Sequence, residues 1–126
     1  MAFGTLAFDT LQTSDLANTA TSKTLDTSFV YNGSAKVWIN FNGTGTIATR
    51  DSFNVTSITD GGTGLYTVTI ANDMGNVNYS TTGAAGENDD SGGNRSLGLR
   101  ARAAGSQNLR GFRDGVAADD MAEMCI

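Results

Sequence analysis

The glycines at positions 43 and 45 give this sequence its closest match to a motif that binds a ligand. Gly43-Thr44-Gly45-Thr46-Ile47-Ala48 follows an apolar run and has the Gly-x-Gly-x-x-Ala spacing that holds a pyrophosphate at a helix start in dinucleotide-binding folds. That chemistry needs a helix directly after the glycines, because its free N–H groups face the phosphates. The residues that follow, TRDSFNVTSI, alternate with a period of two and predict a strand. We therefore predict a hairpin turn with positive φ at Asn42-Gly43, and no nucleotide site.

An acidic, glycine-rich loop, residues 81–94, offers a second candidate site. Glu87, Asp89 and Asp90 carry the hard oxygen ligands that calcium prefers. Their spacing fits no complete calcium-binding loop of the Asp-x-Asp-x-Asp-Gly type. We expect the loop to be exposed and mobile, treat the three carboxylates as candidate interaction residues, and leave calcium binding open.

The remaining reactive residues do not predict a catalytic centre. The chain has no histidine, so it cannot build a histidine-based triad. Its one cysteine, Cys125, has no histidine to activate it, and we expect a small packed residue. Two carboxylate pairs could hydrolyse a glycosidic bond, but both lie in turn-like sequence: Asp51 with Asp60, and Asp119 with Asp120. We predict that the protein is not an enzyme and needs no cofactor or metal, and keep a carbohydrate-active enzyme as a weaker alternative.

The composition indicates one β-rich domain. The 126 residues include 16 glycines and no proline, and 17% are charged. A net charge of −5 argues against nucleic acid as a partner, and no run approaches the roughly 20 apolar residues of a membrane span. Five of the eight basic residues lie in the last third of the chain, where we expect them to form one solvated face: Arg95, Arg100, Arg102, Arg110 and Arg113.

The elements that must position these residues are strands. Residues 1–27 lack periodicity and predict an N-terminal arm, with one candidate strand at FGTLAF, and residues 28–126 predict the β domain. Apolar and polar residues alternate over residues 29–71, and Asn-Gly or Asp-Gly turns separate the alternating runs. This pattern predicts an antiparallel meander. Further strands are expected around NVNYS, SLGLRARA, QNLRGFR and MAEMCI.

Two aromatic residues of the meander are the remaining candidate interaction residues. Trp38 lies on the face opposite Val37, Ile39 and Phe41, where it can stack on a sugar ring or be buried at a subunit contact or in the core. We favour core or interface over ligand stacking. Tyr66 shares a strand face with Val68 and Ile70 and completes the candidate set.

Residues 30–79 resemble a module of tail-fibre-like virion proteins of tailed bacteriophages, of the marine and cyanobacterial type. The resemblance rests on AKVWINF at 35–41, GTG at 43–45, RDSFNV at 50–55, DGGTG at 60–64 with YTV at 66–68, and NY at 78–79. It implies a small β-rich module on the virion surface, usually homotrimeric and often at the distal end of a fibre, where it contacts the host.

Together these observations predict an all-β antiparallel sandwich or jelly-roll-like domain with an extended N-terminal arm, assembled as a homotrimer. The expected partners are further copies of the chain, other virion proteins, and a host surface glycan or protein, with no nucleic acid and no membrane insertion. We expect the protein to be made in the bacterial cytoplasm and to reside in the virion. The expected role is host attachment, and the alternative is a capsid decoration protein that stabilises the phage head.

Overall fold

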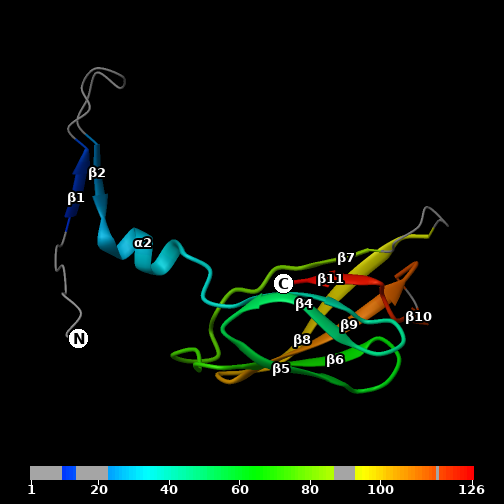
Figure 1. Ribbon diagram of the computed structural model, residues 1–126. Helices are drawn as coiled ribbons and strands as arrows, with labels where there is room; N and C mark the ends of the chain where they lie inside the picture. Colours follow the sequence, from blue (N-terminus) through cyan, green and yellow to red (C-terminus); the bar gives the residue numbers. More distant parts are fainter. Residues whose placement is uncertain (1–9, 14–22, 87–92, 116) are drawn as a thin grey trace. The chain divides into compact units, whose positions relative to one another are not determined.

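The computed structural model describes residues 10–13, 23–86, 93–115 and 117–126 (Figure 1). The chain divides into two compact units, one reaching to Ala35 and the other spanning Lys36–Ile126. This boundary lies later in the chain than the predicted end of the arm at residue 27. Among the described residues, no helix is both long and apolar enough to cross a membrane.

The first unit contains a β-hairpin and a short helix. Strand β1 (Thr10–Thr13) pairs antiparallel with β2 (Lys23–Asp26), and helix α2 (Thr27–Gly33) follows directly. The strand and turn predicted from residue 29 to 35 are therefore wrong, because this segment is largely helical. Ser34 donates to the Val30 carbonyl through both its backbone N–H and its hydroxyl, which satisfies a carbonyl of the last helical turn. The strand predicted at FGTLAF lies outside the described residues.

The second unit consists of two antiparallel sheets in a sandwich-like arrangement, which confirms the mostly-β prediction (Figure 1). The first sheet has the strand order β4 (Ala48–Phe53), β3 (Trp38–Asn42), β11 (Glu123–Cys125), β7 (Ala84–Gly86). In the second sheet β9 (Ser106–Arg113) pairs with β8 (Arg95–Ala103), β6 (Leu65–Ile70) and β10 (Ala117–Ala118), and β6 pairs with β5 (Val55–Asp60).

The core lies between the inward faces of the two sheets. Alternate residues of β3 and β6 are buried, as their alternating sequences predict. Phe41 of β3 meets Tyr66 of β6 edge to face, with ring centroids 5.2 Å apart. The buried cluster comprises Ile39, Phe41, Tyr66, Val68, Leu109, Met121 and Met124.

The predicted continuous meander is interrupted at Asn54. The hairpins β3–β4 and β5–β6 form as expected, but β4 and β5 belong to different sheets. The chain crosses from one sheet to the other through Asn54, which has a φ of 58°. Asparagine is among the few non-glycine residues that adopt this left-handed conformation readily.

The Asn54 side chain fixes this crossing with several hydrogen bonds. Its Nδ2 donates to the carbonyls of Lys36 and Asn72, each at 3.1 Å. Its Oδ1 accepts from the backbone N–H of Asn72 at 2.8 Å. One side chain therefore ties the corner to the segments before β3 and after β6.

The remaining sequence predictions have mixed outcomes. The strands predicted around SLGLRARA and QNLRGFR are confirmed as β8 and β9, and the one predicted at MAEMCI is confirmed in part as β11. The segment NVNYS forms no strand. Strand β7 lies inside the segment predicted as a loop over residues 81–94, because it pairs with β11. The turn after β3 has its positive φ at Gly45, at 62°, and not at Gly43. Gly43 is needed for a different reason, since a Cβ there would lie 2.6 Å from the Tyr66 hydroxyl.

We expect substitutions of Asn54 to separate its backbone conformation from its hydrogen bonds. Asn54→Ala loses both the side-chain bonds and an easily adopted left-handed φ, and should lower the free energy of unfolding by about 2–4 kcal/mol. Asn54→Gly keeps the conformation and should cost about 1–2 kcal/mol. Urea unfolding of both variants measures the difference. Equal free energies of unfolding for Asn54→Ala and Asn54→Gly would show that the left-handed φ at this position contributes nothing to the difference in stability.

Candidate functional site

The outer face of the first sheet carries an exposed aromatic pair. Trp38 of β3 lies directly opposite Phe53 of β4, and both point away from the core because their neighbours Ile39 and Ser52 face the other way. Their exposed fractions are 38% for Trp38 and 53% for Phe53. Of the predicted alternatives, core or interface over ligand stacking, this exposure excludes a position in the core of this domain and is compatible with an interface or a ligand contact.

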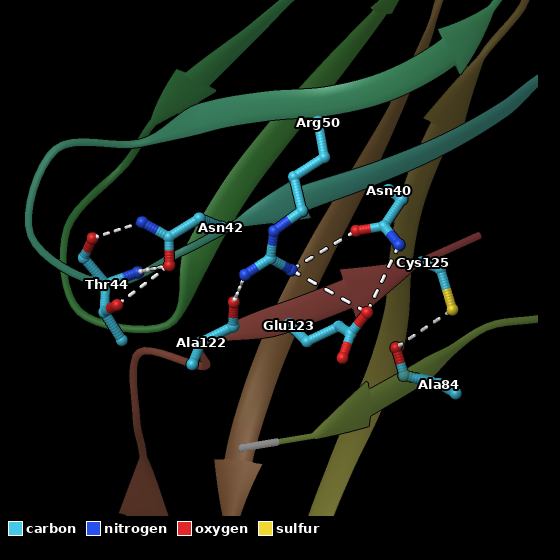
Figure 2. A network of polar contacts seen from close by, with 8 residues as sticks. All are labelled: Asn40, Asn42, Thr44, Arg50, Ala84, Ala122, Glu123 and Cys125. Carbon is cyan, nitrogen blue, oxygen red and sulfur yellow. Dashed lines mark hydrogen bonds and ion pairs between the residues drawn. The ribbon is translucent and has the colours of Figure 1, made fainter. Parts of the chain in front are cut away.

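A β-bulge brings a charged side chain to the same face. Asn40 pairs with Asp51 but the next residue, Phe41, pairs with Thr49, so Arg50 is an extra residue in β4. In a regular strand Arg50 and Asp51 would point to opposite faces. The bulge lets the Arg50 side chain lie across the outer face toward β11 (Figure 2).

Figure 2 shows the polar network that Arg50, Asn40 and Glu123 form. Asn40 follows Trp38 by two residues in β3, so the network lies on the face that carries the aromatic pair. Arg50 Nη2 donates to the Ala122 carbonyl at 2.7 Å, and Nη1 lies 3.4 Å from Asn40 Oδ1 and 3.8 Å from Glu123 Oε1. Asn40 Nδ2 donates to the same Glu123 oxygen at 3.3 Å. The three side chains restrict one another's rotamers and link β4, β3 and β11. An exposed ion pair of this kind contributes only about 0–1 kcal/mol to stability, so its main effect is positional.

Asp51 and Asn42 complete the polar part of this face. Asp51 lies opposite Asn40, and its Oδ1 accepts from the backbone N–H of Ser52 at 2.8 Å. Asn42 holds the turn that follows β3: its Oδ1 accepts from the Thr44 hydroxyl at 2.8 Å and its Nδ2 donates to the Thr44 carbonyl at 2.8 Å (Figure 2). We refer to Trp38, Phe53, Asn40, Arg50, Asp51 and Glu123 as the outer-face cluster.

Tyr66 has a structural position, in contrast to its prediction as an interaction residue. Its side chain is 2% exposed, so it cannot contact a partner of the folded chain. The hydroxyl donates in a bifurcated arrangement to Asp120 Oδ1 at 2.8 Å and to the Gly43 carbonyl at 2.9 Å. Burial, followed by the hydrogen bond to Asp120, raises the pKa of Tyr66 well above its usual value near 10. Tyr66 therefore holds the C-terminal segment against the turn after β3.

The acidic candidates and the cysteine do not form a site within the described residues. Glu87, Asp89 and Asp90 lie outside the residues that the structure describes. In the described part of the chain, no group of three or more histidine, cysteine or carboxylate side chains could hold a metal ion. Cys125 is exposed, so the prediction of a packed residue is wrong, and its Sγ lies 3.9 Å from the Ala84 carbonyl (Figure 2).

The arginines of the last third of the chain do not share one solvated face. Arg102 lies over the Tyr79 ring at 5.7 Å and donates to the Tyr79 carbonyl. Arg110 lies over the Phe112 ring at 4.9 Å and points to the opposite face of β9 from the buried Leu109. Each of these two guanidinium groups lies over an aromatic ring, and Arg102 pairs with the buried Gln107 of β9 whereas Arg110 lies on the other face of that strand.

Two members of the outer-face cluster are candidates in the sequence: Trp38 as an interaction residue, and Asp51 only as a member of a carboxylate pair with Asp60. Period-two alternation places Asn40 on the same face as Trp38, and this part of the signal was available. The pairing of Phe53 with Trp38, the bulge at Arg50 and the arrival of Glu123 on β11 depend on strand register, which the sequence does not display. Comparison of the chain with protein-family models, with curated proteins and with solved structures yields no match.

The arrangement combines a flat apolar surface with fixed hydrogen-bonding groups. Trp38 and Phe53 can cover an apolar patch of a ligand, and Asn40, Asp51 and Glu123 can accept or donate hydrogen bonds beside it. Nothing in this set resembles a nucleophile paired with a base. The outer-face cluster is therefore equipped for binding.

We expect Tyr66→Phe to destabilise the domain and to change its alkaline pH dependence. Without the hydroxyl, Gly43 and Asp120 lose their donor, which should cost about 1–3 kcal/mol near neutral pH. Because the folded pKa is raised, the stabilisation from Tyr66 is fully present below pH 10 and is lost as the pH rises above it.

Urea unfolding between about pH 8 and pH 11 measures this effect. The free energy of unfolding should fall more steeply with pH for the wild type than for Tyr66→Phe. Tyr31→Phe is the matched control, since Tyr31 lies on α2 in the first unit and is 73% exposed. Parallel pH profiles of wild type and Tyr66→Phe would contradict the assignment.

Proposed function

We propose that this chain is a surface-exposed, tail-fibre-like structural protein of a tailed bacteriophage virion that mediates attachment to the host. The resemblance of residues 30–79 supports the virion assignment, and the sandwich-like fold is compatible with it. The observation that carries the attachment role is the exposed pair Trp38 and Phe53 on the outer face of the first sheet.

The outer-face cluster suits a contact surface because it is rigidly supported. Trp38 belongs to β3, an interior strand of its sheet that is paired on both sides. Arg50 and Glu123 reach it from the strands on either side of β3. A surface that is already ordered loses little conformational entropy on binding.

Assembly as a homotrimer would strengthen a weak contact. A single small site binding with a Kd on the order of 1 mM gains about two to four orders of magnitude when several copies engage one surface. Pairing between copies would also cover sheet edges. Strand β4 forms one edge of the first sheet and is largely exposed.

We expect purified protein to bind cells of the bacterial host and the aromatic pair to carry this binding. Trp38→Ala and Phe53→Ala should each reduce cell-bound protein at least about fivefold, since a buried aromatic contact contributes about 1 kcal/mol or more. Leu65→Ala is the matched control, because Leu65 is 38% exposed and lies on the outward face of the second sheet. Equal loss in the control, or no binding by the wild type, would contradict the proposal.

A capsid decoration protein is the second candidate, and the first unit favours it. None of the seven residues of α2 is buried, and Phe29 is 72% exposed. A separate unit with exposed apolar side chains can dock on a neighbouring virion protein.

Heads that lack the protein provide the test of this second function. If decoration is correct, added protein should bind the heads and raise their melting temperature, and Phe29→Ala should weaken this effect while Phe53→Ala does not. Failure of the wild type to bind heads would exclude decoration.

A further inference from the structure

We propose that the outer-face cluster binds a neutral glycan, with Trp38 and Phe53 covering the apolar face of hexopyranose rings and Asn40 and Asp51 bonding the hydroxyls. This inference rests on the proposed attachment function and specifies the ligand of the same surface. The area, the hydrogen-bonding groups and the charge of the cluster favour this ligand.

The aromatic surface has the size of a small ligand. From exposed fractions of 38% and 53%, the two rings together present on the order of 200 Å². A stable protein–protein interface needs about 800 Å² from each partner and an apolar centre depleted in charge. Here the residues next to the aromatic pair along the strands are Asn40 and Asp51. A second copy of the chain is therefore a poor occupant, and a ligand with one apolar face and many hydroxyls is a better one.

The polar groups retain capacity for hydrogen bonds to hydroxyls. An amide side chain offers two N–H groups and two acceptor lone pairs. Asn40 uses one N–H toward Glu123 and accepts from Arg50 Nη1, so one N–H and one lone pair remain. Asp51 Oδ1 accepts a hydrogen bond from the Ser52 N–H, and Oδ2 can still accept one from a ligand hydroxyl. Sugar hydroxyls both donate and accept, and they match this mixed set.

The charge of the cluster selects against acidic sugars. Arg50 is paired with Glu123 at 3.8 Å, which leaves the Asp51 carboxylate without a cation in the cluster. The whole chain has a net charge of −5. A uronic acid would place a carboxylate near Asp51 with unfavourable electrostatics. The electrostatics of this surface therefore exclude an acidic glycan, and a neutral one is compatible with it.

Fluorescence of Trp38 provides a direct measurement, because it is the one tryptophan of the chain. The full chain is titrated with neutral hexamers of glucose, mannose and α-1,4-linked galactose, and with oligogalacturonate of the same length. The last two share the linkage and differ by the carboxylate at C6. We expect at least one neutral hexamer to change the Trp38 emission with a Kd on the order of 1 mM, and oligogalacturonate to bind at least about tenfold more weakly.

Three variants test the assigned contacts. Phe53→Ala keeps the fluorophore and should weaken the neutral ligand about fivefold to tenfold. Asp51→Asn removes the negative charge. It should reduce the ratio between the Kd for oligogalacturonate and the Kd for the galactose hexamer. Leu65→Ala, on the other sheet, should bind like the wild type. Circular dichroism verifies that each variant is folded.

The outcomes separate this inference from the attachment function. Any of three results would overturn the glycan assignment. The Trp38 emission does not change with any neutral hexamer up to about 20 mM, oligogalacturonate binds with the same Kd as the galactose hexamer, or Phe53→Ala binds the neutral ligand with the wild-type Kd. If wild-type protein still binds host cells in that case, attachment stands and its ligand is not a neutral glycan. If the wild type binds a neutral hexamer but not host cells, the glycan site stands and attachment fails.

Discussion

The C-terminal segment Asp119–Ile126 joins the two sheets, and the rest of the domain depends on it. On the second sheet, Asp120 accepts hydrogen bonds from the Gly64 N–H at 2.6 Å and from the Tyr66 hydroxyl at 2.8 Å. On the first sheet, the Met121 carbonyl accepts from Gly43, and β11 pairs with β3 and β7. Gly64 combines a φ of 66° with a close approach, since a Cβ there would lie 2.8 Å from the Asp119 backbone nitrogen. Both sheets therefore have backbone geometry that accommodates this segment.

The candidate binding surface is built on the same segment. Glu123 and the Ala122 carbonyl hold Arg50, and Glu123 also holds Asn40, so the polar half of the outer-face cluster exists because β11 lies beside β3 (Figure 2). The aromatic half depends on the opposite edge, where Asn54 turns the chain into the second sheet directly after Phe53. Interactions that stabilise the fold thus also orient the side chains that we propose to bind ligand.

Local sequence patterns predicted the parts of the structure that local forces determine. The alternation in β3 and β6 follows from apolar periodicity and is confirmed. The strands expected around SLGLRARA and QNLRGFR, whose patterns are less regular, are confirmed as β8 and β9. The helix at Thr27–Gly33, the crossing at Asn54 and the strand β7 were not predicted. Strand β7 has only the residues Ala-Ala-Gly, and it exists because β11, far along the sequence, supplies its hydrogen bonds. The outer-face cluster was found in part for the same reason: Trp38 is visible in the sequence, and its partners require the register.

The central proposal is that this protein is a tail-associated surface module of a phage virion. Locating the protein on phage particles tests that proposal most directly. Antibody raised against the folded domain, coupled to gold and viewed by electron microscopy, reports the position without assuming any ligand. Our account predicts label on the tail, concentrated toward its distal end. Label spread over the head would contradict attachment and favour decoration, and particles free of label would contradict the virion assignment itself.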